Sequence, residues 1–193
     1  MKRWLIVLAV LCCAAAAAVF FLGRRGESLS LAPTVSMELP QTEADGSVLV
    51  PVTLNTLGDA DYPAASFTIV FDPAKLEFLG LEEGTVAVSN RESTSGKMLP
   101  IWSCNADKAN ESGKISILYL DMTAGAHAFS RDIMADDHDL FFLRFRIRGA
   151  FPKKETLQLS WEDAVFAASD ETDSLAAIRG TLKTVDRMFV VGE

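Results

Sequence analysis

Between residues 141 and 148 the chain reads Phe-Phe-Leu-Arg-Phe-Arg-Ile-Arg, and this alternation constrains the fold more than any other feature. Successive side chains of an extended chain point to opposite sides, so one side of this segment is wholly apolar and the other carries three arginines. A period of two is typical of a β-strand with one buried and one solvated face. Past Leu22, no stretch keeps an apolar period of 3.6 over twelve residues. The sequence therefore predicts an all-β fold.

Further strands follow from the same alternation and from the turn residues that separate the apolar runs. Turn signals such as Asp45-Gly46, Asp72-Pro73 and Ser112-Gly113 recur at the spacing of a β-sandwich. The best helical fragment, residues 130–137, would form two turns at most. The predicted strands are, in order, residues 35–39, 47–55, 65–71, 76–81, 85–89, 114–120, 140–148, 156–161, 164–167 and 178–191, the last in one or two pieces.

The N-terminal region contains 19 consecutive uncharged residues, Trp4 to Leu22. At about 1.5 Å per residue, a helix of this length spans roughly the hydrocarbon thickness of a bilayer. Basic residues precede it and alanines at 14–18 offer cleavage positions, so it is either a signal anchor or a signal peptide. An anchor is favoured, because cleavage after the alanines would leave the apolar residues 19–22 at the new N-terminus. We expect an anchor over 1–25, a linker over 26–34 and a domain over 35–193, extracytoplasmic at the cell membrane, or secreted if the segment is cleaved.

Composition restricts what the domain can do. Of 193 residues, 49% are apolar and 23% charged, which excludes disorder and predicts one folded domain. From Gly26 onward the charge is 14 − 26 = −12, which argues against nucleic-acid binding. Cys104 is the only cysteine beyond the membrane segment, so neither an internal disulfide nor a cysteine zinc site is expected. We predict no cofactor, no metal site and a monomer.

Five blocks in this order resemble the cohesin domain, over about Val35 to Val185. The blocks are residues 47–55, residues 65–81 with Phe71-Asp72-Pro73, residues 113–120, residues 140–148, and residues 161–170 with Ala164-Val165-Phe166-Ala167. The resemblance implies a nine-stranded jelly-roll sandwich that lies outside the cell. It also implies binding to the dockerin module of a partner protein, without catalysis.

The resemblance places the partner on one flat sheet face. Phe67, Ile69 and Phe71 alternate with Ser66, Thr68 and Val70, so the second set should face outward. Matching the family to the later strand places Leu118 and Leu120 inside and Ile117 and Tyr119 outside. Cohesins that bind dockerins of the commonest type tend to carry Asn and Asp where this sequence has Ala64 and Ser66.

The three arginines of the alternating segment form an outward row that would attract an acidic partner surface. A solvated charged strand face explains the same pattern. The predicted partner-binding residues are Ser66, Thr68, Val70, Ile117, Tyr119, Arg144, Arg146 and Arg148.

The usual catalytic motifs are missing from the sequence, which predicts no enzyme. His127 reads as a solvated loop residue, and Asp136-Asp137-His138-Asp139 reads as a solvated turn that lacks the spacing of a calcium loop. Two alternatives stay open. A carbohydrate-binding module would need a row of exposed aromatics, whereas Trp102, Tyr119 and Trp161 are scattered; a subunit of an envelope or secretion assembly would form a discrete oligomer.

Overall fold

The computed structural model describes residues 33–58, 60–86, 102–123, 125, 127–131, 134, 138–149, 154–169, 175–177 and 182–191. The predicted membrane segment, most of the linker and part of the predicted helix 130–137 lie outside these ranges. Within them, no helix combines the length and the hydropathy needed to cross a bilayer.

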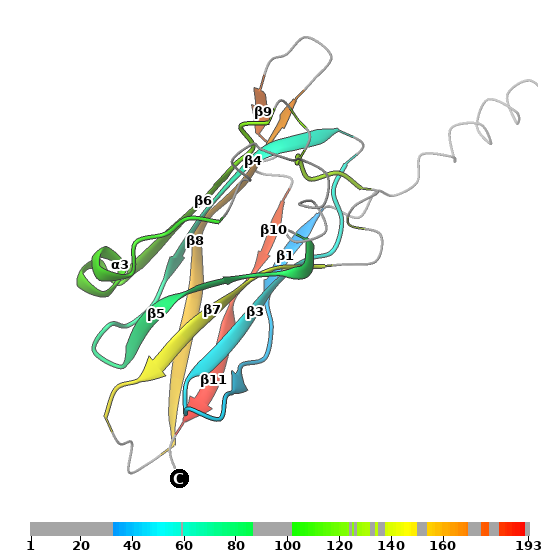
Figure 1. Cartoon of the computed structure of the whole chain (residues 1–193). Coiled ribbons are helices and arrows are strands. Elements are labelled where there is room, and N and C mark those ends of the chain that lie inside the picture. The colour runs from blue at the N-terminus through cyan, green and yellow to red at the C-terminus, as the bar shows by residue number, and fades with distance from the viewer. Residues whose placement is uncertain are drawn as a thin grey trace, which may run out of the picture. The chain divides into compact units, whose positions relative to one another are not determined.

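The described strands form two facing sheets (Figure 1). The first has the order β10-β1-β3-β7-β5, with β2 also on β3, and the second has the order β11-β8-β4-β6, with β9 also on β8. The first sheet comprises β1 (Thr34–Met37), β2 (Gln41–Thr42), β3 (Val48–Leu54), β5 (Leu76–Glu83), β7 (Asp139–Ile147) and β10 (Lys183–Val185). The second comprises β4 (Asp61–Val70), β6 (Lys114–Leu120), β8 (Glu155–Ser169), β9 (Leu175–Ala177) and β11 (Arg187–Val191).

This arrangement confirms the predicted all-β sandwich, with local differences. The strands predicted at 156–161 and 164–167 are one strand, β8, with a register shift opposite Thr68 and Ile69. Thr85 and Val86 lie in a helical turn instead of the strand predicted at 85–89, whose remaining residues are not described. Eleven strands are described where the resemblance implied nine, and three of the eleven, β2, β9 and β10, are fragments of two or three residues.

The core lies between the sheets and is centred on aromatic rings. Phe67 of β4 contacts Phe166 of β8 within its own sheet and Phe141 of β7 in the opposite sheet, with ring centroids 5.5 and 5.7 Å apart. The rings of Trp102 and Trp161 pack against the same phenyl ring at 5.5 and 5.6 Å. Such pairs contribute about 0.5–1.5 kcal/mol each beyond burial of their area. The interior of the sandwich is therefore filled, and its outer faces are left for binding.

The short helix α3 (Ala106–Ser112) precedes β6 and was not predicted. Asn105 caps its N-terminus by accepting a hydrogen bond from the Lys108 backbone at 2.9 Å, and Gly113 ends it in the left-handed conformation at φ 70°. The Asn110 side chain bonds both the N–H and the carbonyl of Phe78, at 2.8 Å each. These contacts fix the point at which the chain enters β6.

Candidate protein-binding face

The outer face of the second sheet is defined by the register of its strands. Ser66 of β4 lies opposite Leu118 of β6 and Val165 of β8, and Thr68 lies opposite Ser116 and Asp163. Facing residues of antiparallel strands point to the same side. The predicted outward orientation of Ser66, Thr68 and Val70 is confirmed, because all three are exposed or half-buried beside buried neighbours.

The predicted orientation of β6 is wrong. Ile117 and Tyr119 are both 1% exposed and belong to the core, whereas Leu118 and Leu120 are 48% and 47% exposed. The Tyr119 hydroxyl donates a hydrogen bond to the His127 carbonyl at 2.8 Å, so the ring can be buried with its polar tip satisfied. The second half of this strand is apolar on both sides, whereas Lys114 and Ser116 mark the outward side of its first half, and a shift of one residue exchanges the two sides.

With this corrected orientation, one end of the outer face of the second sheet is apolar. Leu118 and Leu120 follow one another along the outer side of β6, and Met122, just beyond the strand, is 73% exposed. Across β4 the same end is completed by Ala64, which faces Leu120 and Ala167. A cluster of large apolar side chains on a solvent-exposed face is typical of an interaction site.

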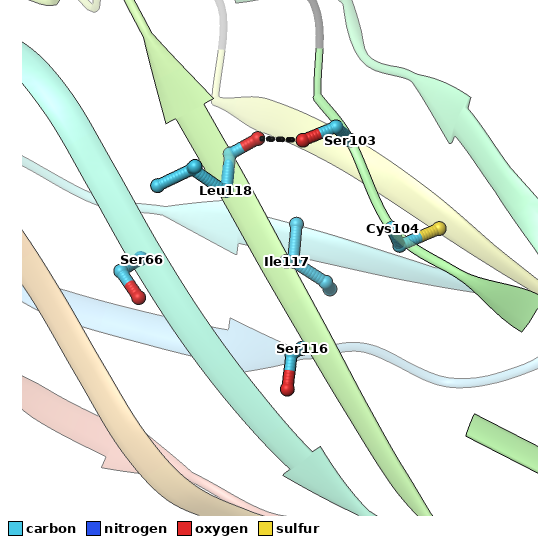
Figure 2. Close-up of a pocket in the computed structure, with 6 residues that line it drawn as sticks. All are labelled: Ser66, Ser103, Cys104, Ser116, Ile117 and Leu118. Carbon is cyan, nitrogen blue, oxygen red and sulfur yellow. Dashed lines mark hydrogen bonds between the residues drawn. The ribbon is translucent and has the colours of Figure 1, made fainter. Parts of the chain in front are cut away.

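A hollow of about 380 Å³ adjoins this apolar end (Figure 2). Ser66 from β4 and Ser116, Ile117 and Leu118 from β6 line it, together with Ser103 and Cys104. Ser103 pairs with Leu118 through two backbone hydrogen bonds of 2.8 and 3.0 Å, and its hydroxyl donates to the Leu118 carbonyl at 3.2 Å. Burial raises the pKa of the Cys104 thiol, so at neutral pH the sulfur is uncharged.

A buried polar network supports the loop that follows β6. The Asp121 carboxylate accepts hydrogen bonds from the Thr123 N–H at 2.7 Å, from the Thr123 hydroxyl and from the His127 N–H at 3.0 Å. Because the Thr123 proton points to the carboxylate, the Thr123 oxygen accepts the proton of His127 Nδ1 at 2.8 Å. His127 is fully buried, so the prediction of a solvated His127 is wrong, and Asp121 is only 8% exposed.

The arginine row lies on the other sheet, so the eight predicted residues do not share one surface. Arg144 and Arg146 project from the outer side of β7, away from β4 and β6. Arg144 Nε bonds Glu82 at 2.7 Å, and Arg146 pairs with Glu77 at 3.2 Å. Arg148 is exposed directly after the strand. The acids of the neighbouring strand therefore balance most of the expected positive stripe.

Other chemistry finds little support in the described residues. Within those ranges, no group of three His, Cys, Asp or Glu side chains is placed to hold a metal ion. Asp136 and Asp137 lie outside them, and His138 Nδ1 contacts the Leu54 carbonyl at 3.0 Å. Of the aromatics weighed for carbohydrate binding, Trp102 and Tyr119 are buried, and the half-buried Trp161 donates its indole N–H to the Val185 carbonyl.

Three of the solved structures that share this architecture illustrate the similarity. The third ScaC cohesin of Acetivibrio cellulolyticus, solved in complex with the ScaB dockerin, is 20% identical, covers 83% of this chain and 99% of its own, and has a TM-score of 0.60. The OlpA cohesin of Clostridium thermocellum, in complex with Doc918, is 18% identical over 81% and 96%, with a TM-score of 0.59. A non-cellulosomal cohesin from Archaeoglobus fulgidus is 13% identical over 83% and 91%, with a TM-score of 0.52.

These similarities establish the jelly-roll fold that the sequence resemblance implied. No curated protein matches the sequence. The family model of the cohesin domain matches residues 33–185, which is most of the chain and nearly all of the sandwich. This protein is therefore a member of the cohesin domain family.

Proposed function

We propose that this chain is a non-catalytic receptor that binds a dockerin-like module of another protein. Family membership supports a binding module instead of an enzyme. Two of the structurally similar cohesins were solved with a dockerin bound, which supports the class of partner. The observation that carries the proposal is the apolar end formed by Leu118, Leu120 and Met122 on a filled sandwich.

The binding surface we propose is the outer face of β4, β6 and β8. Ser66, Thr68 and Val70 belong to it as predicted, and Leu118 and Leu120 replace Ile117 and Tyr119. Exposed leucines that become fully desolvated in a complex can supply much of its binding energy. The arginine row remains a separate prediction, in which an acidic surface of a partner contacts the outer face of the first sheet.

Titration of the immobilised chain with a library of dockerin modules tests this proposal. We expect at least one module to bind, and the double change Leu118→Asp and Leu120→Asp to weaken it by about 2 kcal/mol or more, because charges would be buried against the partner. Met188→Asp is the matched control, since Met188 is 63% exposed on β11 of the same sheet, away from β6. Equal binding by both variants, with unchanged melting temperatures, would place the partner elsewhere.

The domain would be displayed outside the cell by the uncharged segment Trp4–Leu22. In a bacterial host, we expect the chain to sediment with membranes and its domain to be digested by protease added outside the inner membrane. Changing Leu8 and Leu11 to Arg should abolish both results, because two charges in the middle of the segment oppose insertion. Leu8→Ile with Leu11→Val is the control. A soluble wild-type chain protected inside the cell would refute the display.

A further inference from the structure

If the outer face binds a dockerin-like module, as proposed above, the hollow over β6 has a role of its own. It exists because small residues occupy the positions where larger side chains would fill the face. Ser66 and Ser116 lie on neighbouring strands in adjacent rows, so their side chains leave open the space beside Leu118 (Figure 2). A volume of about 380 Å³ is at the lower end of the range for small-ligand pockets, about 300–1,000 Å³.

The walls of the hollow are uncharged. Ser66, Ser103, Cys104, Ser116, Ile117 and Leu118 carry no formal charge at neutral pH. The nearest acids in the register, Asp163 and Glu162, belong to β8, and Glu162 is paired with Lys114 at 2.5 Å. A charged side chain entering this space would exchange water for these uncharged lining atoms, which costs free energy. The hollow therefore selects for an uncharged group.

Polar groups of the hollow can still orient what enters it. The Ser103 hydroxyl is committed to the Leu118 carbonyl, whereas the Ser66 and Ser116 hydroxyls have no hydrogen-bond partner within the described part of the chain. Each hydroxyl can donate one hydrogen bond and accept others. Leu118, on the wall of the same space, is half-exposed and offers an apolar contact.

We propose that this hollow is a socket for one uncharged side chain of the bound dockerin-like module. The side chain packs against Leu118 and enters between Ser66 and Ser116. Apolar residues of the module around this side chain cover Leu120 and Met122. The small serine at 66 makes this space available.

Filling the socket tests the proposal. Ser116→Phe and, separately, Ser66→Phe place a large ring in the hollow at outward strand positions, where aromatic residues are compatible with the sheet. For a dockerin module selected from the library, we expect each variant to raise Kd at least tenfold. Gln158→Phe, at an exposed position of β8 beside β11, is the matched control and should leave Kd within twofold. Ser116→Ala keeps the space open and should retain most of the affinity.

Cys104 gives a second measurement that does not depend on filling the hollow. With Cys12 and Cys13 changed to Ser, Cys104 is the only thiol in the full chain, and its alkylation by N-ethylmaleimide at about pH 8.5 can be followed by mass. A saturating dockerin module should slow this alkylation at least tenfold.

The outcomes separate the socket from the binding function. If a module binds but tolerates both phenylalanines and leaves the Cys104 alkylation rate unchanged, the socket is wrong and the binding function stands. If no dockerin module in the library binds the wild-type chain, both proposals fail. Loss of binding by Gln158→Phe as strongly as by Ser116→Phe would also overturn the socket.

Discussion

The Asp121 carboxylate shows how one residue joins the binding face to the core. It lies directly after Leu120, and its backbone N–H donates to the Pro63 carbonyl at 2.7 Å, which prolongs the pairing of β6 with β4. Its oxygens then hold Thr123 and His127, so the loop carrying the exposed Met122 leaves the sheet in a fixed direction. Burial alone would raise the pKa of Asp121, but hydrogen bonds from Thr123 and from the His127 backbone outweigh it, and the pKa is lowered.

This lowered pKa predicts a pH-dependent stability. A carboxyl whose pKa is lower in the folded state stabilises that state above its unfolded pKa of about 3.9, and the contribution is lost as pH falls through the folded pKa. Asp121→Asn should lower the free energy of unfolding by about 1–3 kcal/mol at pH 7, because its amide would direct a donor at another donor. Urea titrations should show the difference from wild type shrinking below about pH 4. A constant difference down to pH 2, or an equal loss in the exposed α3 variant Glu111→Gln, would contradict this account.

At the scale of elements, β7 and β6 show what a sequence can and cannot determine. In β7 the arginines oppose apolar residues, so the buried side was predicted correctly. In β6, Lys114 and Ser116 share the outward side with Leu118 and Leu120, so the alternation itself indicates the orientation that matching to the family assigned wrongly. The second half of that outward side, Leu118 and Leu120, is apolar, which obscures the alternation and is also the property that makes it a binding face. Helix α3 escaped prediction because seven residues are too few for a period, although Asn105 and Gly113 were available as cap signals.

The whole molecule combines a strongly acidic domain with a binding face that carries few charges. The charge of −12 from Gly26 onward is balanced locally around β7, where Glu82 and Glu77 pair with the arginines. The opposite face carries mostly serine, threonine, alanine, valine and leucine in facing positions, with Asp163 opposite Thr68 and Lys114 opposite Val70. Long-range charge therefore affects how fast a partner approaches, and short-range apolar contact determines how long it stays.

This separation predicts that affinity for a dockerin module is insensitive to salt. Ions screen charges over about 10 Å at 0.1 M and about 3 Å at 1 M, but they do not weaken apolar contacts. Between 0.05 and 1 M NaCl we expect Kd, and with it the association rate constant, to change by less than about threefold. Thr68→Lys would place a charge in the middle of the face and should introduce a salt dependence, whereas Thr68→Gln should not. A tenfold or greater loss of wild-type affinity at high salt would mean that ion pairs dominate, and would direct attention from Leu118 and Leu120 to the acidic residues of β8.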